Sequence, residues 1–217
     1  MPDGPDDQAR LFVHETGGAG TAASAPPRLP FTRVEAAGVL QTAAASENFR
    51  AVGFDATKDL VLGGRRRDYR FVHFATHGYV DADRPQLSSI VLSMVDRAGR
   101  ARDGFLRAHE LYNLELLADL VVLSACETGL GKAVRGEGLI GLTRGFMYAG
   151  APRVAVSLWS VSDRATASLM RRFYEAMLKD GLSPSAALRA AQLAMMKQPG
   201  WQHPYHWAPF IVQGDWR

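Results

Sequence analysis

Residues 120–131 read LVVLSACETGLG, and this stretch decides the fold that we predict for the chain. Its first four residues are apolar and form the short continuous run that is typical of a strand buried on both faces. Cys126, the only cysteine of the chain, follows two small residues. Gly129 and Gly131 then allow a sharp turn and a close approach of the backbone to a ligand. A lone thiol at the end of a buried strand is either a packing residue or a nucleophile.

Length and composition are those of one globular domain with a substantial core. The chain has 217 residues, of which 47% are hydrophobic and 22% charged, and its formal charge of +3 does not predict a nucleic-acid or membrane partner. A single cysteine cannot form an internal disulfide or a Cys-rich zinc site, which favours a reducing compartment. The sequence has no apolar run near 18 residues and no signal-peptide pattern at its acidic start. We therefore expect a cytoplasmic protein.

The N-terminal part of the chain alternates flexible and helical patterns. Residues 1–28 are rich in Gly and Pro and predict a linker or lead-in, with Leu11–Val13 as a short strand inside it, so that the domain proper covers 29–217. Phe31–Thr42 predicts a helix, and a second short helix is expected to end at Gly63. The triplet Arg65–Arg67 is isolated, which favours a solvated loop over a nucleic-acid footprint.

Strand and helix patterns alternate over the rest of the chain. Strands are predicted at residues 69–76, 87–95, 104–106, 120–123, 153–159 and 208–212, and helices at 108–117, 139–149, 163–177 and 184–197. This alternation predicts an α/β fold with a mainly parallel sheet covered by helices on both faces. In such sheets the reactive site lies at the carboxyl ends of the strands. His77, Cys126 and Asp163 each follow a predicted strand, so we expect them at one edge.

The pairing of one histidine with one cysteine predicts nucleophilic catalysis. A thiol needs a neighbouring base or positive field to react, and a leaving amine needs a proton donor, and one imidazole supplies both. His77 precedes Cys126 by 49 residues, close to the caspase spacing. The backbone N–H groups of Gly78 and Cys126 are the predicted oxyanion hole.

Three blocks of sequence resemble one known family. They are FATHG at 74–78, LSACETG at 123–129 and SLWSVSD at 157–163, and WAPF at 207–210 adds to them. Together they resemble the CHAT domain, which is grouped with caspases, gingipains and separases among caspase-like cysteine peptidases. The resemblance covers residues 29 to the C-terminus.

The resemblance implies a caspase-like α/β sandwich that lacks its first strands and a His77–Cys126 dyad that cleaves protein or peptide substrates. It also implies that Asp163 binds a basic P1 side chain, with Glu137 as the other candidate acid. Members of the family usually carry tetratricopeptide-type helical repeats upstream, so a helical-repeat regulator is an expected partner and a regulated protease the expected activity.

Other interpretations of the same residues stay open. Lone cysteines are more often packing residues, and the domain can be a catalytically silent interaction module. Asp163 can equally be a helix N-cap. His73 and His77 have a zinc-like H-x-x-x-H spacing, but their surroundings predict a strand, so no metal is expected. Two phosphate-loop patterns, at residues 126–133 and 136–141, fail in sequence or in context, and no cofactor is expected.

Overall fold

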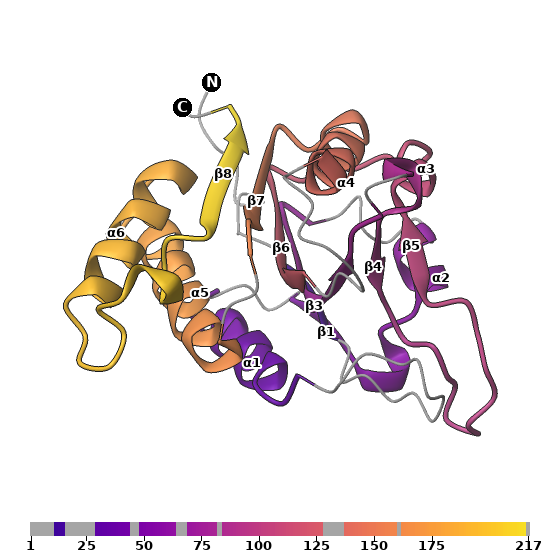
Figure 1. The fold of residues 1–217 in the computed structure, drawn as a ribbon, viewed down its shortest axis with the longest axis horizontal. Coiled ribbons are helices and arrows are strands. Elements are labelled where there is room, and N and C mark those ends of the chain that lie inside the picture. The colour runs from indigo at the N-terminus through magenta and orange to yellow at the C-terminus, as the bar shows by residue number, and fades with distance from the viewer. Residues whose placement is uncertain are drawn as a thin grey trace.

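A computed structural model describes residues 11–15, 29–43, 48–63, 69–81, 84–127, 137–159 and 162–215. The described residues form a central sheet whose main path runs β2-β1-β3-β6-β7-β8, with the β4–β5 hairpin attached to β3 (Figure 1). The strands are β1 (Leu11–Glu15), β2 (Phe49–Val52), β3 (Phe71–Tyr79), β4 (Ser89–Val91), β5 (Phe105–Arg107), β6 (Leu120–Glu127), β7 (Arg153–Ser157) and β8 (Phe210–Gly214). The helices are α1 (Thr32–Thr42), α2 (Lys58–Leu62), α3 (Ala108–Leu111), α4 (Glu137–Tyr148), α5 (Asp163–Leu178) and α6 (Pro184–Met196), with 3₁₀ turns η1 (Gly53–Asp55), η3 (Pro85–Leu87) and η4 (Pro204–His206).

The sheet is mostly parallel, which confirms the predicted fold class. β2, β1, β3, β6 and β7 pair with one another in parallel, whereas β8 pairs with β7 and the β4–β5 hairpin pairs with β3 in the antiparallel sense. The carboxyl ends of the parallel strands therefore share one edge, where the predicted site is expected.

Helices cover the sheet on both faces (Figure 1), and each face has its own apolar core. Helices α1, α5 and α6 pack on one face, and their core includes Leu120 and Val122 of β6. The alternate residues Val121 and Leu123 belong to the core of the other face, with α3 and α4. All four side chains are at most 2% exposed. The strand thus needs an uninterrupted apolar run because neighbouring side chains point into two different cores.

The N-terminal part of the sheet differs from the sequence prediction. β1 is an inner strand between β2 and β3, so the sheet includes Leu11–Glu15, part of the segment that we predicted to be a lead-in. β2 was not predicted, because a run of only four residues, one of them an arginine, is too short to show the periodicity that distinguishes a strand. Its single buried residue, Ala51, explains the weak signal. β1 and β2 both precede β3 in the chain.

Several predicted boundaries move for reasons of pairing. β4 covers only Ser89–Val91 of the predicted strand 87–95, because β5 offers it three partners. α3 covers only Ala108–Leu111 of the predicted helix 108–117. The remaining helix predictions are confirmed within a few residues for α1, α2, α4, α5 and α6. Arg65–Arg67 and the glycine-rich loop before α4 lie outside the described residues. None of the described helices combines the length and apolar character that crossing a membrane requires.

Gly150 ends α4 as the sequence predicts. Its φ of +112° lies in the region that favours glycine, and a Cβ built on it would stand 2.5 Å from the carbonyl oxygen of Leu116. The close approach fixes the return of the chain toward β7, the strand beside β6.

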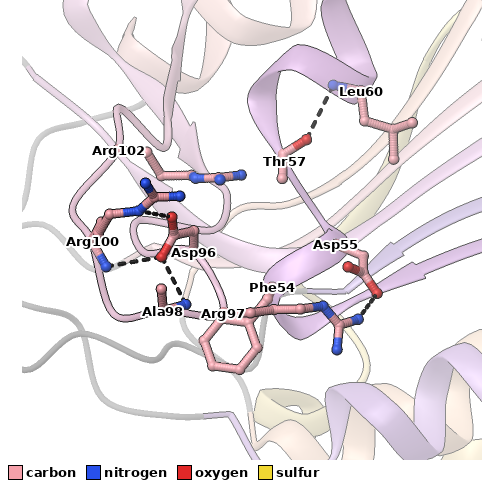
Figure 2. Close-up of a pocket in the computed structure, with 9 residues that line it drawn as sticks. All are labelled: Phe54, Asp55, Thr57, Leu60, Asp96, Arg97, Ala98, Arg100 and Arg102. Atoms are coloured by element: carbon pink, nitrogen blue, oxygen red, sulfur yellow. Dashed lines mark hydrogen bonds and ion pairs between the residues drawn. The ribbon is translucent and has the colours of Figure 1, made fainter.

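Charged groups join the tip of the β4–β5 hairpin to η1 and α2. A pocket between η1, α2 and the hairpin tip is lined by ion-paired side chains, Asp55 with Arg97 at 2.6 Å and Asp96 with Arg100 at 2.6 Å (Figure 2). Arg102 lines the same pocket. These contacts hold the tip of the hairpin whose base pairs with β3.

Lys58 makes the more buried of these connections. Its Nζ lies 2.8 Å from Asp103 Oδ2 and 2.7 Å from Glu110 Oε1. Burial acts to raise the pKa of Asp103, but hydrogen bonds from Lys58 and Arg107 outweigh it and lower the pKa to about 2. The pKa of Glu110 is likewise lowered, by Lys58 and by the backbone N–H of Arg107 against the effect of burial.

We predict that Lys58→Met lowers the free energy of unfolding at pH 7 by about 1–2 kcal/mol, because two carboxylates lose a partly buried cation. Both carboxyl groups have a lowered pKa in the folded state, so their stabilisation is present above the ordinary carboxyl pKa and is lost as the pH falls. The difference between the variant and the wild type should therefore shrink between about pH 4 and pH 2, in urea unfolding curves recorded across that range.

Lys179→Met is the matched control, because Lys179 is 56% exposed and lies 3.9 Å from its partner Glu175. It should change stability by less than about 0.5 kcal/mol. Equal effects of the two substitutions at pH 7 would contradict a stabilising role of the Lys58 cluster.

Candidate active site

The pairing of β3 with β6 brings His77 and Cys126 together. The two strands pair in parallel through eight residue pairs, from Phe71 opposite Leu120 to Gly78 opposite Glu127, and His77 is the direct partner of Cys126. Neighbouring strands lie about 4.8 Å apart, so the two backbones are adjacent at this point. Both residues lie in the last part of their strands, whereas the sequence placed them just past the strand ends.

The extension of β3 through His77 has a structural cause. β1 pairs with β3 only as far as Ala75, and from His77 onward β4 pairs with it instead, with His77 opposite Val91. The backbone groups at the end of β3 therefore stay in a sheet after β1 has ended. The hydroxyl of Thr76 also donates a hydrogen bond to the carbonyl oxygen of Val91.

His77 thus lies on β3 at a point where this strand pairs with β4 on one side and β6 on the other. Its side chain is 1% exposed, so the imidazole is almost completely enclosed by the protein. Gly78, the predicted oxyanion donor, lies opposite Ile90 of β4 and Glu127 of β6. The backbone of Cys126 is described and its side chain is not, so the thiol–imidazole distance stays a prediction.

A buried polar network lies four residues before His77 on the same strand. His73 Nε2 lies 2.9 Å from Glu35 Oε1 of α1, and His73 Nδ1 lies 3.2 Å from the hydroxyl of Tyr174 of α5. All three side chains are at most 1% exposed. The network therefore connects β3 to α1 and α5, two helices of one covering layer, and both ring nitrogens of His73 have partners within it. Within the described ranges no three potential ligand side chains gather around a metal position.

One assignment of donors and acceptors satisfies every contact of the network. In it Nε2 of His73 donates to the carboxyl oxygen of Glu35, and Nδ1 accepts from the hydroxyl of Tyr174. Burial raises the pKa of Tyr174 well above its ordinary value, and the charge of Glu35 raises it further, so the phenol keeps its proton and stays a donor. Both ring nitrogens of His73, the Tyr174 hydroxyl and Glu35 Oε1 then each have a hydrogen-bond partner. This avoids the free-energy cost of a buried polar group without a partner.

Asp163 is the first residue of α5 and binds the start of α1. Its Oδ2 accepts a hydrogen bond of 2.7 Å from the backbone N–H of Phe31. Asp163 thus supports α1, while the N-cap position of α5 belongs to Ser162, whose side chain makes no capping hydrogen bond. Burial raises the pKa of Asp163, the Phe31 N–H opposes this, and the charge of Glu35 raises it further. Within the described part of the chain, no partner is recorded for its second oxygen, Oδ1.

Fewer contacts are recorded for Glu137, the other candidate acid, and for Trp159 of the third sequence block. Glu137 is the first residue of α4, and its side chain lies outside the described residues. Trp159 follows β7 at the same edge of the sheet and donates a hydrogen bond of 3.4 Å from Nε1 to the carbonyl oxygen of Tyr205 in η4. Neither the Figure 2 pocket nor the groove between α1 and α5 is lined by His77 or Cys126.

Sequence reasoning missed Glu35 and Tyr174. A signal for Glu35 exists, because it lies on the buried stripe of α1 together with Thr32, Ala36 and Val39. A carboxylate on the core side of a helix requires a buried partner, and a histidine in a buried strand is the natural one. Nothing in the sequence marks Tyr174 as different from an ordinary core aromatic.

Comparisons with known proteins bear on the family and the fold of the chain. The family model described as the CHAT domain matches residues 4–215. Tetratricopeptide repeat protein 28 of Mus musculus is 38% identical over 114 residues, which are 52% of this chain and 5% of that protein. The Homo sapiens protein of the same name is 38% identical over 110 residues, 51% of this chain and 4% of its own length. The chain thus matches only a small part of these relatives.

Two solved structures share the fold. The Arg-specific cysteine proteinase gingipain R aligns with a TM-score of 0.58 at 11% identity, over 98% of this chain and 48% of that one. Separase of Saccharomyces cerevisiae, solved with securin, aligns with a TM-score of 0.56 at 13% identity, over 94% of this chain and 12% of that one. At these identities the likeness shows a common caspase-like α/β architecture.

The contact of Asp163 with Phe31 predicts different effects of two substitutions. Because the pKa of Asp163 is raised in the folded state, its favourable contribution is largest at acid pH and is lost as the pH rises through that pKa. Asp163→Asn keeps an acceptor for the Phe31 N–H and removes the buried charge, so we expect it to be at least as stable as the wild type at pH 7. Any gain should disappear near pH 3.

Asp163→Ala removes the acceptor and should cost about 1 kcal/mol at both pH values. Thermal unfolding at pH 3 and pH 7 distinguishes the variants. If Asp163→Asn were as destabilising at pH 7 as Asp163→Ala, the ionised carboxylate itself would be needed to hold α1.

Proposed function

The chain belongs to the CHAT domain family, and on this premise we propose that it is a cysteine endopeptidase of the caspase and separase type with a His77–Cys126 dyad. The observation that carries the proposal is the pairing of His77 with Cys126 across β3 and β6. This position is at the carboxyl end of a parallel sheet, where α/β folds place their reactive groups. The fold shared with gingipain R and separase is consistent with the same reaction class.

In the proposed reaction the thiol of Cys126 attacks the carbonyl carbon of the scissile peptide bond. His77 takes up the thiol proton and donates it to the leaving amine as the C–N bond breaks. Water then cleaves the thioester with the same imidazole as general base, which releases the acid product and restores the thiol. The burial of His77 favours this role, because a packed imidazole keeps its geometry through both steps.

The N–H groups of Gly78 and Cys126 are the proposed donors to the oxyanion that forms during the attack. They lie at neighbouring positions on the two paired strands. Donors that already point at the position of the substrate oxygen need no reorganisation when charge develops there, which is the condition for effective transition-state stabilisation.

Asp163 is the proposed acid for a basic P1 side chain. Its position after β7 puts it at the carboxyl edge of the sheet, and Oδ1 remains for a ligand while Oδ2 holds Phe31. A guanidinium or ammonium group supplies the charge-assisted hydrogen bond that a partly buried carboxylate lacks in this arrangement. Glu137, at the start of α4, is the second candidate acid.

A catalytically silent interaction module is the second candidate function. The observation that favours it is the match to tetratricopeptide repeat protein 28, of which the chain covers 5% in the mouse protein. In that case the same domain would serve a helical-repeat protein as a binding or regulatory part, in cis or in trans. The presence of both His77 and Cys126 favours the peptidase over this alternative.

We predict that Cys126→Ala and His77→Ala each lower the rate of cleavage of fluorogenic peptides with Arg or Lys at P1 by about a thousandfold or more. The reason is that nucleophile and base act as a unit. Cleavage by the purified wild-type chain and both variants gives the comparison, with circular dichroism to confirm that each variant is folded.

An arginine-type electrophilic probe separates the two candidate functions. It should label Cys126 in the wild type, and His77→Ala should suppress the labelling. A folded wild-type chain that neither cleaves nor becomes labelled would contradict the peptidase and favour the interaction module.

We predict that Asp163→Asn lowers kcat/KM for P1 Arg substrates about tenfold, while the rates for neutral P1 residues change little. Because this substitution preserves the acceptor for Phe31, a loss of preference would report on the substrate and not on folding. An unchanged ratio of Arg to neutral P1 rates would assign the preference elsewhere, with Glu137→Gln as the next variant.

A further inference from the structure

A groove runs between α1 and α5, outside the His77–Cys126 site. The two helices lie side by side on one face of the sheet (Figure 1), and residues of both line the groove. α5 follows β7, and Asp163 at its start holds Phe31 at the start of α1. One end of the groove therefore lies at the carboxyl edge of the sheet, and the other extends away from it along both helices.

The lining of this groove carries one sign of charge. Its charged members are all arginines, one from α1 and two from α5: Arg33, Arg164 and Arg171. All three are exposed, and no Asp or Glu is part of the lining. Arg171 pairs with Glu175 at 2.9 Å, and no ion pair is recorded for Arg164 within the described residues. Arg164 therefore adds a positive charge to a lining that contains no acidic side chain, although the whole chain carries only +3.

Small residues of both helices also line the groove, and we call them its floor. They are Ala37 and Gly38 of α1 and Ala167 and Ser168 of α5. A glycine inside a helix costs about 1 kcal/mol relative to alanine, and a Cβ built at Gly38 would make only ordinary contacts, 3.7 Å from Arg171 Cδ. A larger side chain at Gly38 would occupy the groove. Val34, which also lines it, is 56% exposed and adds apolar surface.

We propose that this arginine groove binds an acidic peptide segment of a protein partner. The arginines match carboxylates, and the small floor and the exposed Val34 match the aliphatic parts of a peptide. A nucleic acid fits less well, because three arginines in one groove fall short of the broad basic stripe that a phosphate backbone needs. The proposal concerns a surface distinct from the dyad and does not depend on peptidase activity.

The test uses a fluorescein-labelled peptide of eight glutamates and the full chain, with binding followed by fluorescence anisotropy at 50 mM salt. The peptide should bind the wild type, and Arg164→Glu should weaken binding about three- to tenfold, because the substitution reverses a charge in the groove. Gly38→Gln should also weaken binding by filling the floor at constant net charge, and its better helix propensity keeps α1 intact. Raising the salt concentration should reduce the affinity of the wild type.

Arg189→Glu is the matched control, because Arg189 is an exposed residue of α6 that does not line the groove. It should leave binding within about twofold of the wild type. Equal losses in Arg164→Glu and Arg189→Glu, or no binding to the wild type, would overturn the proposal. Tighter binding of a single-stranded oligonucleotide than of the peptide would overturn it in favour of a nucleic-acid partner.

A further variant tests the chain itself as the occupant. Residues 1–10 include three aspartates, Asp3, Asp6 and Asp7. If the glutamate peptide bound only after all three were replaced by asparagine, the segment would be an internal ligand of the groove, and a partner protein would not be its occupant.

Discussion

The parallel pairing of β3 with β6 is the constraint on which the candidate site depends. These two strands occupy the middle of the sheet, and their register makes His77 and Cys126 direct partners. A shift by one residue would move every side chain of one strand to the opposite face. Such a shift is opposed by both apolar cores, because Leu120 to Leu123 fill the two layers alternately. The packing that stabilises the sheet and the geometry that the proposed chemistry requires are therefore set by the same residues.

The surroundings of β3 explain how a candidate catalytic residue can be held within a strand. Upstream, His73 is fixed by Glu35 and Tyr174, which belong to two different helices. Downstream, β4 replaces β1 as the pairing partner, so the strand stays ordered as far as Tyr79. Polar groups buried in this way are stable only when each has a partner, and satisfied networks make the arrangement specific. His77 thus lies between a polar anchor inside the core and a hairpin at the edge.

The covering layer of α1 and α5 has two roles in this arrangement. On its inner side Glu35 and Tyr174 contact β3, and at its end the carboxylate of Asp163 joins the two helices through Phe31. On its outer side the layer carries the arginine groove. A partner bound in that groove would contact the helices that hold β3 and Asp163, so binding there and the geometry of the site share the same structural elements.

The sequence by itself determined the fold class, most of the helices and the strands of the core, because apolar periodicity and glycine positions are local signals. It also determined the family, since the blocks around His77, Cys126 and Asp163 are contiguous. Only the tertiary structure decided that β1 is an inner strand, that β3 continues through His77, and that Asp163 holds the start of α1. These features depend on pairing and burial between residues far apart in the chain, such as Phe31 with Asp163, 132 positions later. A segment as short as β2 becomes a strand only when a neighbouring strand supplies its hydrogen bonds.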